Sequence, residues 1–148
     1  MPDQPKVDPV DRQIVALLQE DARRSFQDIG KHVHLSAPAV KRRIDRLEAE
    51  GVIRGYTAAV DPALYGWMTE AFVDLYCDGR MPGEAIRRVV EQEAGVTAAY
   101  TVAGESSAIL HVMARDTKDL ESTLERIRAV DGVNRTVSEV VLSTLFER

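Results

Sequence analysis

The stretch Leu35–Gly51, LSAPAVKRRIDRLEAEG, has the features of a short capped helix. Ser36 is a preferred N-cap residue, because its hydroxyl can accept a hydrogen bond from a free amide of the first turn. Pro38 falls in that first turn, where a missing N–H costs little. Gly51 can adopt the left-handed conformation that ends many helices. The pattern therefore predicts a helix that begins near Ser36 and ends at Gly51.

The predicted helix has one apolar face and one basic face. At about 100° per residue, the apolar side chains fall on one side: Ala37, Val40, Ile44 and Leu47. Cations surround the opposite side: Lys41, Arg42, Arg43 and Arg46. Such a run is commonly a solvent-exposed face, here partly paired with Asp45 and Glu48. It is also what a helix that binds DNA requires, so the surrounding sequence has to distinguish the two interpretations.

The two predicted helices before this one favour DNA binding. Asp8, followed by proline, is a strong start for a helix over 9–20. Ser25 starts a second helix, whose apolar side comprises Phe26, Ile29 and Val33. Gly30 inside this helix costs about 1 kcal/mol relative to alanine, which indicates a close helix approach. His34 lies in the following turn, where we expect a left-handed backbone. Two short helices joined by a tight turn, the second of them basic, predict a helix-turn-helix.

A strand is expected after the basic helix, over residues 52–60, which gives the first domain a winged-helix-like character. Arg54 in this segment is a candidate phosphate contact. We place the first domain at residues 1–60, with a polar lead over 1–7. A linker, 61–68, contains the only tryptophan, Trp67.

The second half alternates between strand and helix patterns and forms a predicted domain over 69–148. The expected elements are strands at 69–77, 96–103, 108–114 and 133–146, with helices at 82–94 and from Thr117 to Val130. The order β-α-β-β-α-β is typical of a ferredoxin-like fold. The whole chain is therefore expected to be α+β, with a helix-turn-helix domain and a ferredoxin-like domain.

One face of this sheet is expected to need a cover from a second molecule. Both helices of the pattern cover the other face, and apolar residues would be left exposed: Phe72, Tyr76, Ile109 and Met113. A second copy would bury them, so the sequence predicts an obligate oligomer. A dimer would also present two basic helices to DNA half-sites about 34 Å apart.

Composition excludes several classes of protein. The chain has 148 residues and a net charge of −5, and the acidic excess lies in residues 62–148, with 9 Lys and Arg against 14 Asp and Glu. No apolar run is long enough for a membrane span, and the N-terminus does not resemble a signal peptide. One cysteine, Cys77, fits the reducing cytoplasm, where we expect the protein.

Neither a metal site nor an active site is expected. The three histidines, His32, His34 and His111, lack metal-ligand spacing to acids or to the cysteine. No nucleophile elbow, phosphate-binding glycine loop or paired-carboxylate signature is present. The sequence therefore predicts a protein that is not an enzyme and needs no cofactor.

Three segments together resemble the leucine-responsive/asparagine-regulator (Lrp/AsnC, feast/famine) family. They are DPVDRQIVALLQEDARRSFQDIG, LSAPAVKRRIDRLEAEGVIRGYTAAVDP and the AGES turn before ILHVMARD, and the resemblance covers about residues 8–146. It implies a transcription regulator that binds double-stranded DNA through its N-terminal domain. It also implies homodimers that assemble into octamers or related rings, and an amino-acid effector bound between dimers.

The resemblance also implies an effector site in the C-terminal domain. The corresponding positions are the turn Gly104, Glu105, Ser106 and Ser107, with Thr136 and Ser138 on the last strand. The family turn is commonly Gly-Asp-x-Asp, with the last carboxylate binding the effector's ammonium group. Here Ser107 replaces that carboxylate, and a neutral hydroxyl pairs with a cation more weakly. The effector could instead bind through Glu105, be of another kind, or be absent.

For the DNA contacts we expect two groups of residues. Base edges would be met by Ser36, Pro38, Ala39, Arg42 and Arg43, and phosphates by Lys41, Arg46 and Arg54. Arg42 is the first candidate for a guanine contact, because arginine is the usual bidentate partner of that base. Two functions remain open: a sequence-specific regulator that responds to a small molecule, and an architectural DNA-wrapping protein without an effector.

Overall fold

The computed structural model describes residues 6–79 and 81–146, so most of the predicted lead over 1–7 lies outside the described residues. The chain divides into two compact units at the junction between Ala59 and Val60. Each unit is described by itself. No helix in the described part of the chain is long and apolar enough to cross a membrane.

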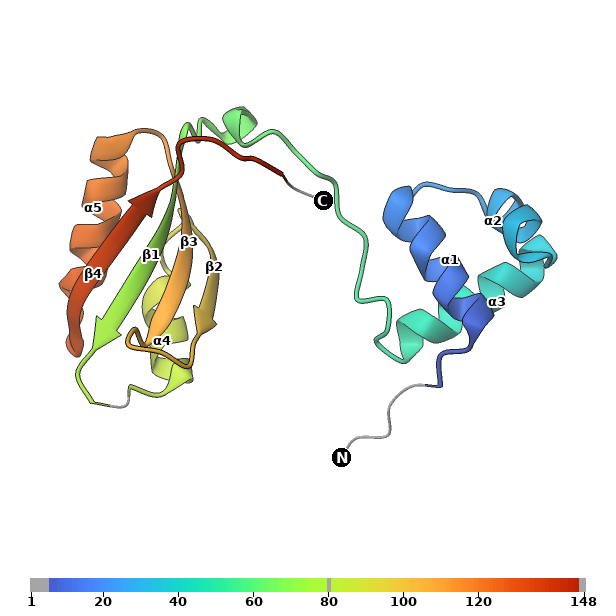
Figure 1. Cartoon of the computed structure of the whole chain (residues 1–148), viewed down its shortest axis with the longest axis horizontal. Helices are drawn as coiled ribbons and strands as arrows, with labels where there is room; N and C mark the ends of the chain where they lie inside the picture. Colours follow the sequence, from blue (N-terminus) through green and yellow to red (C-terminus); the bar gives the residue numbers. More distant parts are fainter. Residues whose placement is uncertain (1–5, 80, 147–148) are drawn as a thin grey trace. The chain divides into compact units, whose positions relative to one another are not determined.

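The first unit is built from α1 (Pro9–Glu20), α2 (Phe26–Val33) and α3 (Ala37–Ala49) (Figure 1). Each begins as the sequence predicts, with a side-chain N-cap from Asp8, Ser25 or Ser36. The apolar stripes of the three helices meet in one core, whose buried members are Ile14, Ile29, Val33, Val40 and Ile44. Burial of these stripes fixes how the three short helices pack, since none of them would be stable alone in water.

The turn between α2 and α3 has the predicted geometry. His34 has φ 56° and ψ 43°, which is the left-handed conformation. Gly30 is buried, and a Cβ atom added to it would overlap the carbonyl oxygen of Leu35. The backbone N–H of Leu35 in turn donates to the carbonyl of Gly30 at 3.0 Å. A tight turn and a close helix approach are thus achieved together.

Two expectations for this unit are wrong. The strand predicted over 52–60 does not form, because the N–H groups of Val52 and Ile53 both donate to the Leu47 carbonyl and close the end of α3. No strand lies beside this segment within residues 6–59, and Ile53 packs against the helical core instead. Phe26, expected on the buried side of α2, is 39% exposed.

The second unit has a four-stranded sheet with two helices on one face (Figure 1). Its elements are η1 (Pro62–Tyr65), β1 (Thr69–Cys77), α4 (Gly83–Val90), β2 (Val96–Thr101), β3 (Ala108–Ala114), α5 (Thr117–Arg128) and β4 (Val133–Val140). The strand order is β2-β3-β1-β4, and all three pairings are antiparallel. This confirms the predicted βαββαβ order.

Alternate residues of the two central strands form the core. Ala71, Val73 and Leu75 of β1 and the matching residues of β3 are buried beneath α4 and α5. On the other face, Phe72 is 45% exposed and lies opposite His111 across the β1–β3 pair. Met113, which was expected to be exposed there, is buried. The period of two along a strand explains this division of the sheet into a packed face and an open face.

Four elements are shorter than predicted: β2 ends at Thr101 instead of 103, α5 ends at Arg128 instead of Val130, and two others differ more. The helix expected over 82–94 ends at Val90, and the strand expected over 133–146 ends at Val140. Val140 lies opposite Ala71, and the N–H of Val141 makes a last bond to the Glu70 carbonyl. Since β1 begins at Thr69, the chain beyond has no strand to pair with. Strand length is therefore set by the partner rather than by the apolar pattern.

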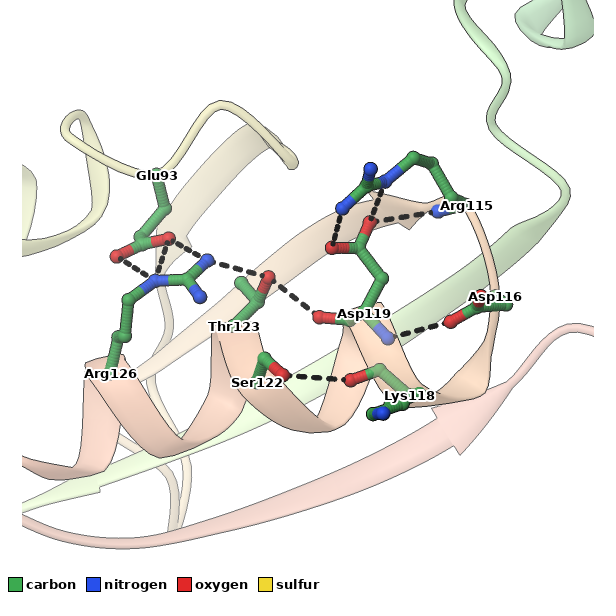
Figure 2. A network of polar contacts seen from close by, with 8 residues as sticks. All are labelled: Glu93, Arg115, Asp116, Lys118, Asp119, Ser122, Thr123 and Arg126. Carbon is green, nitrogen blue, oxygen red and sulfur yellow. Dashed lines mark hydrogen bonds and ion pairs between the residues drawn. The ribbon is translucent and has the colours of Figure 1, made fainter.

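Figure 2 shows the polar contacts that fix α5. Asp116, rather than the expected Thr117, caps the helix by accepting from the Asp119 N–H at 2.7 Å. Arg115 holds the Asp119 carboxylate with two guanidinium nitrogens and lowers the pKa of Asp119 to about 2. At the other end, Arg126 binds Glu93, which follows α4, at 2.7 Å. These contacts join α5 to neighbouring segments on the packed side of the sheet.

Candidate functional site

The exposed face of α3 is centred on Arg42. Ser36, at the start of the helix, accepts a hydrogen bond from the Ala39 N–H at 3.4 Å. Val40, Ile44 and Leu47 are buried in the core. Arg42 projects from the side opposite to these residues and is exposed. Its guanidinium group is thus available to a ligand that approaches this face.

One flank of α3 is stabilised by contacts close in sequence. Lys41 donates to Asp45 at 2.6 Å, one turn further along the helix. The hydroxyl of Tyr56 donates to Glu48 at 2.8 Å. Burial and this hydrogen bond raise the pKa of Tyr56 to about 12. The Lys41 pair is of the kind expected for a solvent-exposed face, while the Tyr56 contact ties the segment after α3 back to the helix.

On the other flank, Arg43 and Arg46 are directed toward α1. Arg43 donates to Asp8 at 2.6 Å and to Asp11 at 2.8 Å. Arg46 donates to the second carboxylate oxygen of Asp11 at 2.5 Å. Burial acts to raise the pKa of Asp11, but hydrogen bonds from Arg43, from the Asp8 backbone and from Arg46 outweigh it and lower the pKa. Two of the cations that we expected to face DNA therefore hold α3 against α1.

Arg54 lies in the irregular segment after α3 and is exposed. The segment and α1 line an open pocket of about 400 Å³ on the first unit, and Arg54 is among its lining residues. Of the eight expected DNA-contacting residues, six thus lie on or beside the exposed face of α3 or on this segment: Ser36, Pro38, Ala39, Lys41, Arg42 and Arg54.

The turn Gly104–Ser107 joins β2 to β3 and is fastened to β1 at one end. The N–H of Ser107 donates to the Leu75 carbonyl at 2.8 Å, and its hydroxyl accepts from the Cys77 N–H at 3.1 Å. Gly104 and Glu105 are exposed, while Ser106 and Ser107 are half-buried. The Ser107 oxygen is thus used to close the sheet, and Glu105 carries the free carboxylate of the turn.

Thr136 and Ser138 lie on the packed side of the sheet edge. Thr136 is opposite Leu75, and Ser138 is opposite Val73. Strand β1 lies between β4 and β3, and neighbouring strands are about 4.8 Å apart, so Thr136 is about 10 Å from the turn residues at the same level. The fold brings Thr136 to the end of the sheet that carries the turn, while Ser138 lies opposite the middle of β1.

Two domain families match this chain. The AsnC-type helix-turn-helix domain matches residues 7–48, and the Lrp/AsnC ligand binding domain matches residues 70–148. The chain belongs to the Lrp/AsnC family. It is therefore a transcription regulator with a DNA-binding helix-turn-helix domain and a ligand-binding domain, and this family consists of regulators rather than enzymes.

Individual Lrp/AsnC proteins match over nearly the full length. The HTH-type transcriptional regulator Rv2324 of Mycobacterium tuberculosis is 48% identical over 143 residues, which is 97% of each chain. The regulator LrpA of the same organism is 36% identical, over 95% of this chain and 93% of LrpA. The solved M. tuberculosis feast or famine regulatory protein complexed with L-methionine has a TM-score of 0.88, with 33% identity and 95% coverage of both chains.

The sequence did not indicate the carboxylates that hold α3, Asp8 and Asp11. Asp8 was assigned only as an N-cap, and nothing in the sequence near Arg43 indicates a partner more than thirty residues away. The two charges gave no separate signal, because a capping box already accounts for both Asp8 and Asp11. No group of three or more His, Cys, Asp or Glu that could hold a metal ion occurs among the described residues.

Proposed function

We propose that this regulator binds DNA in a sequence-specific manner through α3, and that Arg42 is the main residue that distinguishes bases. The observation that carries the proposal is the position of Arg42, exposed and opposite the buried stripe of α3. Arginine in the major groove donates in a bidentate manner to guanine. Around it, Ser36, Pro38 and Ala39 would meet base edges, and Lys41 and Arg54 would meet phosphates. Arg43 and Arg46 would support the helix from the side of α1.

The test is the replacement Arg42→Ala, measured on DNA selected from a random pool by the unchanged protein. We expect the variant to lose about 1–3 kcal/mol of binding free energy and to accept other base pairs at one position. Arg23→Ala is a matched control, since Arg23 is an exposed arginine between α1 and α2. Unchanged affinity and unchanged base preference for Arg42→Ala at controlled salt would show that this face of α3 does not read DNA.

The oligomeric state is proposed from the open face of the sheet. Phe72, Tyr100 and Val137 are 45%, 59% and 40% exposed there, and a cavity of about 630 Å³ lies between this face and the segment after β4. A second copy that covers this face would bury these side chains, and further assembly to an octamer or a related ring would follow the family. Phe72→Glu should dissociate the dimer in sedimentation, while Phe26→Glu, an exposed aromatic of the first unit, should not. A dimer that persists in the Phe72 variant would refute this placement.

An amino acid or a related small molecule is the proposed effector, bound at the turn 104–107 between dimers. Support comes from the exposed Glu105 carboxylate and from the solved relative that carries L-methionine. Since the Ser107 oxygen already accepts from Cys77, Glu105 would bind the ammonium group, with Gly104, Ser106, Thr136 and Ser138 nearby. A cytoplasmic location is part of the same proposal.

Calorimetry against the twenty amino acids separates this proposal from the alternative. Binding that is lost in Glu105→Gln would support an effector site at the turn. The control Glu121→Gln removes an exposed carboxylate from α5. If no amino acid binds the unchanged protein, the architectural function without an effector is favoured.

A further inference from the structure

Four charged side chains form a cluster between α1 and α3, in which Asp8 and Arg46 are 43% and 42% exposed. Asp8 is the N-cap of α1 and Asp11 lies in its first turn, while Arg43 lies in the middle of α3 and Arg46 in its last turn. Asp11 is completely buried, with 0% of its side chain exposed, and Arg43 is 28% exposed. Within residues 6–59, ion pairs between the start of α1 and α3 occur only in this cluster, which links the cap of one helix to the basic surface of another.

The capping of α1 explains why these two carboxylates are so well placed. Asp8 accepts from the Asp11 N–H at 2.8 Å, and Asp11 accepts from the Asp8 N–H at 3.0 Å. Each carboxylate is therefore fixed by the backbone of the other residue before any arginine binds. A charged acceptor that is already oriented binds a guanidinium strongly, and Asp11 is also buried.

The cluster changes how many cations of α3 are available to DNA. Lys41 pairs with Asp45, and Arg43 and Arg46 pair with the two carboxylates of α1. In the part of the chain that the structure describes, Arg42 is the only one of these four cations without a carboxylate partner. A count of basic residues along α3 thus overstates its attraction for phosphates.

We propose that Asp8 and Asp11 are positioning residues that hold Arg43 and Arg46 away from DNA phosphates, so that α3 binds DNA mainly through contacts that depend on sequence. The proposal rests on the proposed DNA-binding face of α3. Phosphate contacts give affinity for every sequence, whereas base contacts give specificity. An arginine held by α1 does not contribute to phosphate binding. It keeps α3 at a fixed orientation for the base contacts.

Two substitutions distinguish the proposal from a direct contact between these arginines and DNA phosphates. Asp11→Asn removes the charge that holds both arginines, and Arg46→Gln removes one arginine while Asp11 keeps Arg43. If the arginines are withheld from DNA, Asp11→Asn should increase affinity for any sequence, and Arg46→Gln should leave the salt dependence unaltered. If Arg46 binds a phosphate directly, Arg46→Gln should reduce the salt dependence.

The experiment uses the full chain and two duplexes, one selected by the unchanged protein and one of random sequence. Binding is measured between about 50 and 200 mM salt, where each phosphate contact contributes about 0.9 to the slope of log K against log salt. For Asp11→Asn we expect a slope on random DNA that is steeper by about 0.9 to 1.8, because one or two arginines are released. The ratio of selected to random affinity should fall. Asp21→Asn at the far end of α1 changes the net charge equally and serves as the control.

The outcomes separate the inference from the proposed function. Failure of the unchanged protein to prefer any selected sequence would refute sequence-specific binding itself. Equal slopes for Asp11→Asn and the unchanged protein, equal effects of Asp11→Asn and Asp21→Asn, or a reduced slope for Arg46→Gln would overturn the inference alone. If circular dichroism shows that Asp11→Asn is unfolded, the slope measured for Arg46→Gln decides, because that variant keeps Asp11 paired with Arg43 and removes only one arginine.

Discussion

Replacing Gly30 with alanine should destabilise the helix-turn-helix although alanine is the better helix former. In an open helix the change gains about 1 kcal/mol. Here the new methyl group would overlap the carbonyl oxygen of Leu35, which belongs to the turn that leads into α3. Because the obstacle is backbone and the N–H of Leu35 bonds to Gly30, the turn itself has to move. Overpacking of this kind costs about 1–3 kcal/mol, so the net loss is about 0–2 kcal/mol.

Hydrogen exchange of the full chain measures this loss of stability in the helices beside the turn. Amides of α2 and α3 should exchange faster in Gly30→Ala, while amides of β1 in the other unit provide an internal reference. Affinity for selected DNA should fall as well, since the turn sets the angle between the two helices. His34→Gly is the matched variant of the same turn: it removes the strain of a left-handed non-glycine residue and should be stabilising by up to about 1 kcal/mol.

The opposite result would refute this reasoning about the turn. If Gly30→Ala were stabilising by about 1 kcal/mol, as in an open helix, the close approach of Gly30 and Leu35 could not be what selects glycine there.

Three further changes should have defined effects. Arg43 lowers the pKa of Asp8, and Arg43 and Arg46 lower the pKa of Asp11 below 3.8. The stabilisation that these carboxylates give is therefore present above about pH 4 and is lost as the pH falls further, so an acid titration of helicity should show a weaker loss for Asp11→Asn. Ser107→Ala should lose the hydrogen bond from Cys77 and lower the free energy of unfolding of the second unit by about 0.5–1.5 kcal/mol in denaturant titration, and a change below that range would contradict the structural role of the hydroxyl. Leu110→Ala, at a completely buried position of β3, should cost about 2–5 kcal/mol in the same measurement.

Local sequence patterns determined the helices, the order of the strands and the sharp turns. N-caps, apolar periodicity and the glycine at position 30 report interactions between residues a few positions apart, so Asp8, Ser25 and Ser36 could be assigned before the structure. The position of Arg42 on α3 follows from the same period, because its angle from the buried stripe is fixed by helix geometry.

Tertiary structure decided the features that depend on a distant partner. Residues 52–60 look like a strand but have nothing to pair with, and β4 ends at Val140 because β1 begins at Thr69. Likewise, the direction of a long arginine side chain depends on which charge lies within its reach. Arg43 and Arg46 bind carboxylates 32 to 35 residues away in the chain, which no local pattern reports. The sequence by itself determined which residues line the basic helix, and only the packing of α1 on α3 decided which of their charges remain free for DNA.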